Sequence, residues 1–293
     1  MPTAPSTLPR RLVGFSTKCY FDLPTTTSYV ADLLALLPPR YPSPDLGLFL
    51  IPSFPAIPAV AAALDAADPH HTSNPTPRIL LGAQNCHHED SGAFTGEVSP
   101  VILKQVGCDI VEIGHAERRR PPLKETDEQI AAKAAAVVRN GMVPLVCIGE
   151  KEQPPGLRKR RRDGEGESTS EEDMREEAIR AAAEECEEQV RPIFESVPEN
   201  AAIIFAYEPV WAIGAAEPAD ARHVCGVVRE LRSYGNSVRR AISANGDVRW
   251  LYGGSAGPGV WEGLKQDLDG LFLGRFAHDV KRFIGTVEEV NEG

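Results

Sequence analysis

The feature that most constrains the fold of this chain is a short apolar run followed by helix-like sequence, which occurs eight times. The runs cover residues 11–15, 46–51, 78–83, 109–113, 142–148, 202–207, 248–252 and 270–273. Continuous apolar strands that alternate with amphipathic helices are typical of a parallel sheet covered by helices. Eight such units in one domain favour closure into a barrel, so the sequence predicts an α/β fold of the (β/α)8 class.

Helix caps support this alternation, most clearly in the segment 99–107. Ser99 is an N-cap residue, Pro100 occupies the first helical position, and Gly107 closes the segment. Serine, proline and glycine are each favoured at those places. No glycine-rich GxGxxG turn follows the first apolar run, and we therefore favour the closed barrel over an open nucleotide-binding sheet.

Two segments fall outside the alternating pattern. Residues 1–10 contain three prolines and no apolar core of a signal peptide, so we expect a flexible N-terminal tail. Residues 153–173 are rich in Pro, Gly, Ser and charge, which predicts a mobile insertion in a barrel of residues 11–293. The basic run 158–162 inside the insertion is interpreted as solvated, and steering of an anionic substrate is a less favoured alternative.

Composition excludes several classes of function. The formal net charge of -11 and the pI near 5.2 argue against a general binder of nucleic acids or of anionic membranes. No apolar run approaches the length of a membrane span. The six cysteines are widely spaced without a CxxC pair, and the histidines have no metal-ligand partners at convincing spacing. We therefore expect free thiols, no metal and a cytoplasmic location.

Three polar side chains follow apolar runs at the point where each run ends. Lys18 follows the first run, His115 the fourth and Glu208 the sixth. A Glu-Pro pair after a strand is common in solvated turns, so Glu208 alone assigns no function. In a closed parallel barrel, however, the carboxyl ends of all strands meet at one rim, where enzymes of this fold carry their active sites. The sequence therefore predicts that the three side chains converge.

Six segments match one known family in the family's order. They are residues 82–86, 91–100, 114–119, 146–150, 207–214 and 252–255. Through these segments the chain resembles the triosephosphate isomerase family over nearly its whole length, from Leu12 to about Val290. The resemblance implies a TIM barrel and an aldose-ketose isomerase that moves a proton on a short sugar phosphate through an enediolate. It also implies that neither a cofactor nor a metal takes part.

The resemblance assigns a role to each candidate residue. Such a proton transfer needs a base beside the carbon acid, an electrophile at the carbonyl oxygen and a cation for the developing charge. The family pattern gives these roles to Glu208, His115 and Lys18, with Glu117 and Cys147 in support. Glu117 is expected to form an ion pair with Lys18. The candidates for binding substrate and its phosphate are Ser16, Gly214, Gly254, Ser255, Gly274 and Arg275.

The chain departs from the family pattern around the expected substrate site. The first loop reads Ser16-Thr17-Lys18 where the family has Asn-Trp-Lys, and Arg275 replaces the second of two adjacent glycines. The lid that follows Glu208 is shorter, because residues 215–218 lead directly into the next helix. Ala116 replaces the serine after the expected catalytic histidine. Since Lys18, His115 and Glu208 are retained, we expect the chain to keep the isomerase chemistry of the family. The departures lie around the substrate, so we expect them to change which sugar phosphate is accepted.

Three functions therefore stay open. Triose phosphate, the family's dominant substrate in glycolysis and gluconeogenesis, is the favoured prediction. A tetrulose (erythrulose) phosphate is the alternative, because an arginine matches phosphate oxygens bidentately and a smaller serine enlarges the pocket. The alternative of another class is a non-catalytic barrel, since a shortened lid protects an enediolate poorly.

The loop 84–98 bears on the oligomeric state. It retains the sequence Gly-Ala-Phe-Thr-Gly at residues 92–96. In the family this loop projects into a neighbouring subunit, near its lysine and histidine loops. The resemblance therefore predicts a homodimer that contacts its partner through residues 84–98.

Overall fold

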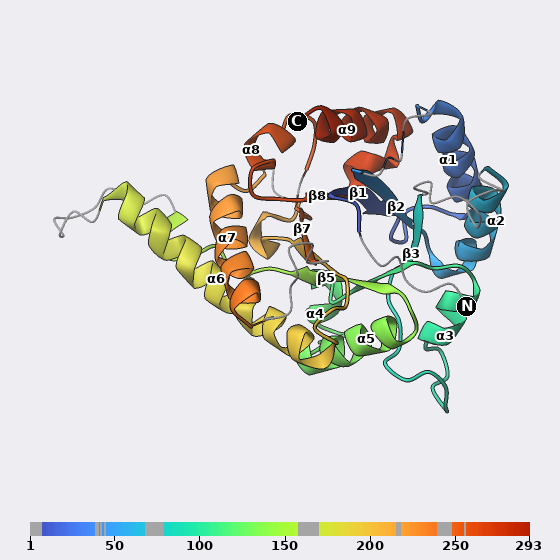
Figure 1. The fold of residues 1–293 in the computed structure, drawn as a ribbon, viewed down its shortest axis with the longest axis horizontal. Helices are drawn as coiled ribbons and strands as arrows, with labels where there is room; N and C mark the ends of the chain where they lie inside the picture. The colour runs from blue at the N-terminus through green and yellow to red at the C-terminus, as the bar shows by residue number, and fades with distance from the viewer. Residues whose placement is uncertain are drawn as a thin grey trace.

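Eight parallel strands close into a barrel in which each strand pairs with its sequence neighbours and β1 pairs with β8 (Figure 1). The computed structural model describes residues 8–38, 41, 43, 45–67, 79–157, 170–214, 218–238, 248–254 and 256–293. The strands are β1 Arg11–Ser16, β2 Leu46–Ile51, β3 Leu80–Ala83, β4 Ile110–Ile113, β5 Val143–Ile148, β6 Ile203–Tyr207, β7 Val248–Tyr252 and β8 Gly270–Leu273. The predicted (β/α)8 class is confirmed.

Helices surround this barrel on the outside (Figure 1). In the described part of the chain the α-helices are α1 Leu23–Leu36, α2 Ile57–Ala67, α3 Pro100–Gln105, α4 Ala116–Arg119, α5 Asp127–Arg139, α6 Glu171–Ser196, α7 Ala221–Val238, α8 Trp261–Leu264 and α9 Val280–Glu292. Short 3-10 turns are η1 Phe54–Ala56, η2 Pro155–Leu157, η3 Val210–Ala212 and η4 Arg275–His278. The predicted cap of α3 is present, because the Ser99 hydroxyl accepts the N–H of Val101 at 3.1 Å.

Two apolar clusters hold the layers together. Successive side chains of a strand point to opposite faces, so each strand supplies both clusters. One cluster contains no helix residue and fills the inside of the barrel, with Leu12, Phe49, Ile110 and Leu145 among its members. The other joins the outer faces of the strands to the helices. Closure depends on Gly270, because a Cβ atom there would lie 1.8 Å from the carbonyl oxygen of Leu12.

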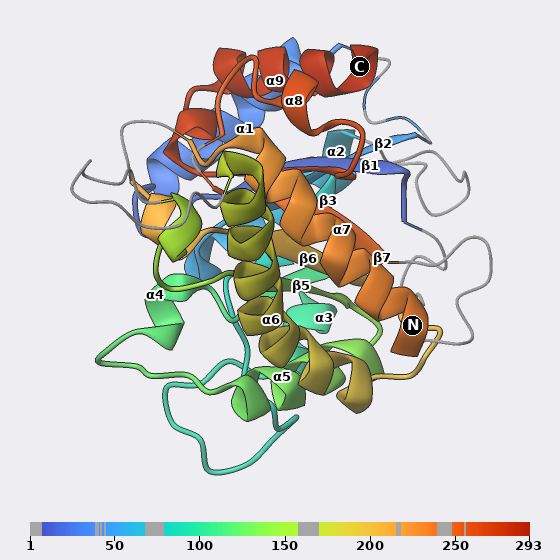
Figure 2. The ribbon, with the colours of Figure 1, turned by 90° about the vertical axis from the view of Figure 1, so that its left-hand side faces the viewer.

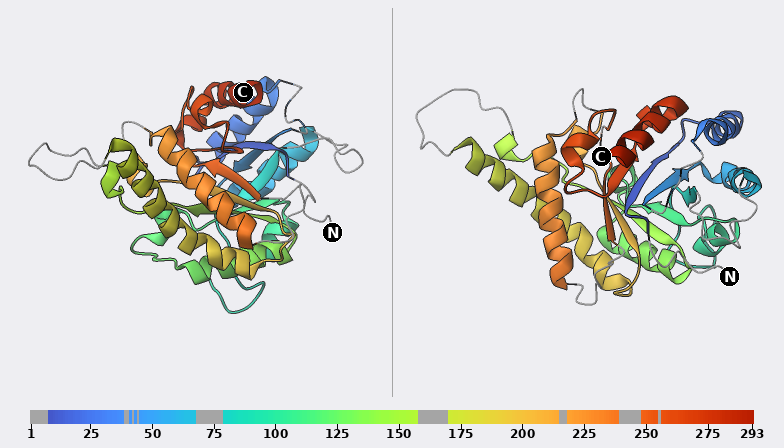
Figure 3. Two further views of the ribbon diagram at one scale, coloured as in Figure 1. Left: turned by 60° about the vertical axis from the view of Figure 1, so that its left-hand side comes forward. Right: turned by 45° about the horizontal axis from the view of Figure 1, so that its top comes forward.

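The longest helix in the described ranges is α6, with 26 residues. It begins at a capping box in which the Ser170 hydroxyl accepts the N–H of Asp173 at 3.1 Å. α6 runs beside α7 (Figure 2), and its N-terminal part extends beyond the barrel (Figure 3). Of the predicted insertion 153–173, residues 158–169 lie outside the described residues, and residues 171–173 form the first turn of α6.

None of the helices in the ranges given above combines the length and the apolar character that a membrane span needs. The cysteines all carry free thiols, with Cys19 exposed and the other five buried.

Candidate active site

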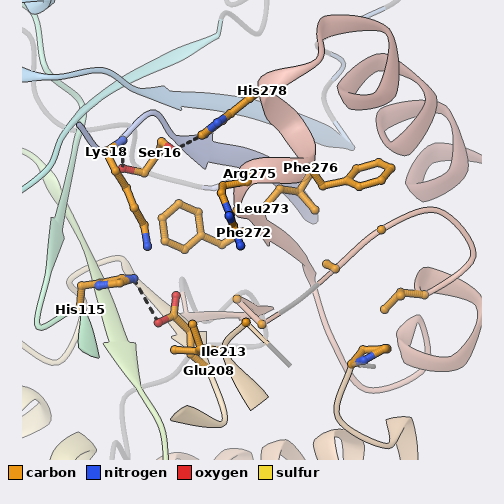
Figure 4. A pocket seen from close by; sticks show the side chains of 18 of the residues that line it. Ser16, Lys18, His115, Glu208, Ile213, Phe272, Leu273, Arg275, Phe276 and His278 are labelled. Atoms are coloured by element: carbon orange, nitrogen blue, oxygen red, sulfur yellow. Dashed lines mark hydrogen bonds and ion pairs between the residues drawn. The ribbon is translucent and has the colours of Figure 1, made fainter. Parts of the chain in front are cut away.

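A cavity of about 530 Å³ opens at the carboxyl-terminal ends of the strands (Figure 4). The walls come from the loops that follow β1, β4, β6, β7 and β8. The predicted site residues that line it are Ser16, Lys18, His115, Glu117, Glu208, Gly214, Gly254, Gly274 and Arg275. Cys147 is not in the lining, and Ser255 lies outside the described residues. Residues from near both ends of the sequence, from Ser16 to His278, thus surround one space.

His115 is held as a neutral imidazole whose Nε2 carries the proton. The residue is the N-cap of α4, and its Nδ1 accepts the backbone N–H of Glu117 at 3.1 Å. An imidazole that accepts at Nδ1 carries its proton on Nε2. Burial, followed by the nearby charge of Lys18, lowers the pKa of His115 to about 4. The imidazole is therefore uncharged at neutral pH and can donate a hydrogen bond from Nε2.

Glu208 lies against that donor. It follows β6 directly, is 3 % exposed, and places Oε2 3.5 Å from the Nε2 atom of His115 (Figure 4). Burial raises the pKa of Glu208 to about 8, although the charge of Lys18 opposes the shift. The backbone at Gly253 leaves room for this side chain, since a Cβ atom there would lie 2.6 Å from Cγ of Glu208. The carboxyl group is therefore a stronger base than one in water.

Lys18 supplies a cation to the same space. Its Nζ lies 2.9 Å from Oε1 of Glu117, which lies in the first turn of α4. Burial lowers the pKa of Lys18, but the hydrogen bond and charge of Glu117 outweigh it, so the net pKa is raised. Lys18 has a φ of +46°, in the left-handed region, and its carbonyl oxygen accepts a hydrogen bond from Gln84 at 3.0 Å. The backbone of Lys18 thus has an unfavourable conformation, and its protonated amine lies beside the cavity.

Arg275 and three glycines form the opposite part of the cavity wall. Arg275 is the first residue of η4, and its guanidinium enters the cavity from the end of β8 (Figure 4). It forms no ion pair with any other residue described in the structure. Gly254 and Gly274 follow β7 and β8, and Gly214 has a φ of +77° at the end of the segment after Glu208. A guanidinium beside open backbone is suited to phosphate oxygens.

Cys147 lies inside the barrel and supports Glu208 from below the cavity. It is a member of the inner cluster, and its thiol hydrogen-bonds with the Glu208 side chain. Burial raises the pKa of Cys147 well above the ordinary value of a thiol, so the group keeps its proton. It can therefore donate to the carboxylate but is not poised as a nucleophile.

A buried network fixes the segment that leads from Glu208 to Gly214. The carboxylate of Glu150 accepts the hydroxyl of Tyr207 at 2.9 Å and the indole N–H of Trp211 at 2.7 Å. Nε2 of His223, on α7, lies 3.1 Å from the same carboxylate. These contacts join the end of β6, the turn η3 and the start of α7.

Sequence reasoning missed two residues of this region. Glu112, on β4, is a buried carboxyl within an apolar run, and its charge inside that run was the available signal. Burial raises the pKa of Glu112 to about 7, and a hydrogen bond with Ser16 opposes the shift. His278 lines the cavity with Nε2 3.4 Å from the carbonyl oxygen of Ser16, and no spacing in the sequence relates these two residues.

Comparisons with known proteins agree with this arrangement. The model of the family described as triosephosphate isomerase matches residues 11–290. The L-erythrulose-1-phosphate isomerase of Pectobacterium atrosepticum is 37% identical over 282 residues, which cover 94% of each chain. The protein of that name from Rhizobium etli is 37% identical over 251 residues, 85% of this chain and 81% of its own. The one from Brucella melitensis is 39% identical over 255 residues, 83% of this chain and 82% of its own.

These matches test the resemblance that the six segments suggested. The family model spans nearly all of the chain, including every strand of the barrel. The relatives are isomerases by name and align over most of their own length. The predicted family and the predicted enzyme class are confirmed, and the chain is a sugar-phosphate isomerase. It belongs to the triosephosphate isomerase family.

Proposed function

We propose that this enzyme isomerises a tetrulose phosphate, with L-erythrulose 1-phosphate as its substrate. The observation that carries the proposal is that Ser16 and Arg275, which depart from the triose-phosphate pattern, line one cavity with Lys18, His115 and Glu208. The names of the relatives support the same substrate. Triose phosphate, which the sequence favoured, is less well supported, and so is a place in glycolysis and gluconeogenesis.

The chemistry of this substrate dictates where the carbonyl goes. L-erythrulose 1-phosphate has its ketone at C2 and a phosphate ester on the C1 oxygen, so the carbonyl can move only to C3. Removal of the C3 proton gives an enediolate across C2 and C3, and a proton added at C2 leaves the ketone at C3. One hydroxyl proton moves from O3 to O2, and no atom is gained or lost. The product is erythrulose 4-phosphate, so the reaction converts one ketose into another, whereas the sequence suggested an aldose-ketose pair.

We assign the proton transfers to the residues around the cavity. Glu208 removes the C3 proton and returns a proton to C2, because burial makes its carboxylate a strong base. His115 donates its Nε2–H to the carbonyl oxygen, since Nδ1 is occupied by the N–H of Glu117. Lys18 stabilises the negative charge of the enediolate, and Glu117 holds the amine in place. Cys147 supports Glu208 through its hydrogen bond.

We assign the phosphate to the part of the wall that follows β7 and β8. Arg275 offers a planar pair of donors for two phosphate oxygens. The backbone at Gly214, Gly254 and Gly274 has no side chain to keep the phosphate away, which suits N–H donors to an anion. Ser255 lies outside the described residues, and we include it among the phosphate-binding residues because of its position in the sequence.

Assembly, location and domain division stay predictions. A homodimer through residues 84–98 is supported by Phe94, which is 42 % exposed and packs against His87 with ring centroids 4.2 Å apart. The loop is fastened to the barrel, because Arg139 donates to Asp90 at 3.0 Å.

Cytoplasmic location rests on the free thiols. The division into a tail of residues 1–10, a barrel of residues 11–293 and an insertion at residues 153–173 rests on composition.

The test compares substrates on one preparation. The rate of conversion is measured with L-erythrulose 1-phosphate, erythrulose 4-phosphate, dihydroxyacetone phosphate and glyceraldehyde 3-phosphate. We expect kcat/KM for the tetrulose esters to exceed that for the triose esters by about 100-fold or more. In D2O, deuterium should enter C2 or C3 of the tetrulose ester, and Glu208→Gln should abolish both conversion and exchange.

Two outcomes contradict the proposal. Equal or faster turnover of the triose esters would restore triosephosphate isomerase as the function. No turnover of any ester by a folded protein would favour the non-catalytic barrel.

A further inference from the structure

The turn η4 carries two polar side chains of the cavity wall, three residues apart. Arg275 is the first residue of the turn and His278 the last, and both line the cavity. Side chains three residues apart in a 3-10 turn lie on the same face, and three residues rise by about 6 Å along its axis. The turn therefore presents a guanidinium and an imidazole to one cavity, separated by one turn.

The ring of His278 is held by residues at the end of β1 and in the loop that follows it. Its centroid lies 4.8 Å from that of Phe21 and 5.3 Å from that of Tyr20. Its Nε2 lies 3.4 Å from the carbonyl oxygen of Ser16, which is long for a hydrogen bond. A carbonyl oxygen can only accept, so Nε2 carries the proton in this contact. These neighbours fix both the place and the tautomer of the ring.

His278 is a hydrogen-bond acceptor at neutral pH. Burial lowers its pKa, and the charges of Lys18 and Arg275 lower it further, although the contact with Ser16 opposes the shift. A neutral imidazole with its proton on Nε2 accepts at Nδ1. This Nδ1 forms no hydrogen bond with any residue that the structure describes, and it is not one of the buried polar atoms without a partner. The half-buried ring therefore has a solvent-accessible acceptor in the cavity wall.

Acceptors are scarce among the polar side chains of this wall. Lys18, His115 and Arg275 present N–H groups, which suit phosphate and carbonyl oxygens. The carboxylate of Glu117 is already paired with Lys18 at 2.9 Å. The wall thus offers several donors to the oxygens of a substrate and few acceptors to its hydroxyl groups. Nδ1 of His278 is one of these few.

We propose that His278 is a specificity-determining residue whose Nδ1 binds the terminal hydroxymethyl group of the tetrulose phosphate. This inference rests on the proposed function. L-erythrulose 1-phosphate carries its phosphate and its C4 hydroxyl at opposite ends of a four-carbon chain. Arg275, His278 and Glu208 surround the same cavity (Figure 4). With the phosphate at Arg275 and the reacting carbons at Glu208, the C4 hydroxyl reaches His278 one turn along η4 and donates to its Nδ1.

The two ends of the substrate are the same before and after the reaction. The carbonyl moves from C2 to C3, whereas the phosphate ester and the hydroxymethyl group keep all their bonds. The contacts with Arg275 and His278 therefore persist from substrate to product and hold the reacting carbons at Glu208. Binding of this kind stabilises substrate and transition state equally, so its loss should raise KM and leave kcat nearly unchanged.

The experiment removes the hydroxyl group from the substrate and the acceptor from the enzyme. The measured ratio is kcat/KM for L-erythrulose 1-phosphate divided by kcat/KM for its 4-deoxy analogue. The analogue has a methyl group in place of the hydroxymethyl group and can undergo the same proton transfer. The ratio is determined for the full-length wild type, His278→Gln, His278→Asn and His278→Leu. Lys281→Leu, at an exposed position three residues further along the chain, is the matched control. Thermal unfolding shows whether each variant is folded.

The variants separate the acceptor at Nδ1 from the donor at Nε2. The wild type and Lys281→Leu should prefer the hydroxylated ester about tenfold, the effect of one hydrogen bond. His278→Leu should bring the ratio within about twofold of one, with kcat changed less than about threefold. His278→Gln should do the same, because its amide N–H can replace Nε2 toward Ser16 but leaves the place of Nδ1 empty. His278→Asn should keep the ratio within about threefold of the wild type, since its amide oxygen can replace Nδ1.

Several results overturn the inference. A ratio near one in the wild type, or the wild-type ratio in both His278→Gln and His278→Leu, would show that His278 does not bind the hydroxyl group. Equal losses in His278→Asn and His278→Gln would show that the residue does not act as an acceptor. A fall in Lys281→Leu equal to that in His278→Leu would show that any change near η4 has this effect. Absence of turnover of L-erythrulose 1-phosphate by the wild type would instead overturn the proposed function, and this inference with it.

Discussion

The backbone N–H of Glu117 donates to Nδ1 of His115 at 3.1 Å, and this bond fixes the proton of the imidazole on Nε2. The first turn of α4 therefore sets the tautomer of the His115 ring. It orients the ring so that Nε2 lies 3.5 Å from Oε2 of Glu208. A neutral donor and a basic carboxylate consequently face one cavity, and both depend on burial.

The pH dependence of catalysis should report Glu208. Its pKa is raised to about 8, and the base must be deprotonated, so kcat/KM should fall as the pH drops below about 8. His115 does not contribute in this range, since its pKa is lowered to about 4. The measurement is kcat/KM between about pH 7 and about pH 10, above the second ionisation of the substrate phosphate at about pH 6. A flat profile over that range would contradict the prediction.

The same pKa makes stability depend on pH. The folded state keeps the proton of Glu208 up to about pH 8, whereas an unfolded glutamate loses it near its ordinary pKa of 4.5. The stability that Glu208 contributes is therefore fully present below the unfolded pKa of 4.5. It is lost as the pH rises from there through the folded pKa of about 8. Glu208→Gln removes this loss, so it should raise the free energy of unfolding by at most about 5 kcal/mol near pH 9 and change it little near pH 4. Urea denaturation at the two pH values measures both differences, and equal differences would refute the argument.

Shortening the base should affect turnover more than binding. Glu208→Asp keeps the charge but withdraws the carboxylate from the substrate carbon, so kcat should fall about 100-fold while KM changes less than about threefold. Steady-state kinetics on the tetrulose ester measure both values. Glu171→Asp, an exposed position at the start of α6, is the control and should leave both unchanged. A rise in KM with an unchanged kcat would mean that Glu208 binds substrate and does not remove the proton.

At position 18, a glycine variant should be more stable than an alanine variant, which is the reverse of the usual order. The φ of Lys18, +46°, lies in the left-handed region, which glycine adopts with little strain. Lys18→Gly should therefore be more stable than Lys18→Ala by about 0.5 to 1 kcal/mol, after the greater flexibility of unfolded glycine is counted. Both variants should lose kcat/KM by about 100-fold or more, because the ammonium is missing.

A matched pair of variants at Lys104 tests whether backbone conformation explains the relative stability of glycine and alanine at position 18. Lys104 lies within α3, where glycine is unfavourable, so Lys104→Gly should be less stable than Lys104→Ala. Chemical denaturation measures all four variants. If glycine were the less stable residue at both positions, the backbone strain at Lys18 would have no energetic consequence.

Much of the fold could be predicted because strands inside a closed parallel barrel are buried on both faces. β2, for example, is buried at all six of its positions, and its sequence is a continuous apolar run. Lys18, His115 and Glu208 could be located for a related reason, since each lies within about three residues of the end of such a run. The four-residue helix α4 could not be predicted, because one turn is too short to show helical periodicity.

That Glu112 and Ser16 face the same interior of the barrel, where Ser16 affects the pKa of Glu112, could not be predicted from the sequence. Periodicity indicates which face of a strand a side chain occupies, but not which interior side chains meet across a closed barrel. β1 and β4 do not pair with each other, so no register relates the two residues. Only closure of the barrel brings them together. Contacts across the interior of the barrel are therefore less visible in the sequence than residues that follow the carboxyl ends of the strands.

The oligomeric state should be decided by the loop 84–98. The wild type is expected to scatter light as a particle of about twice the chain mass of 31.8 kDa. Phe94 is exposed on this loop, so Phe94→Asp should place a charge in the interface and give a monomer. The monomer should also lose activity, because in the family this loop lies near the lysine and histidine loops of the neighbouring subunit. Leu36→Asp, a similar change at an exposed position of α1, should leave the dimer intact. An active wild-type monomer would contradict the prediction, and so would an unchanged dimer of Phe94→Asp.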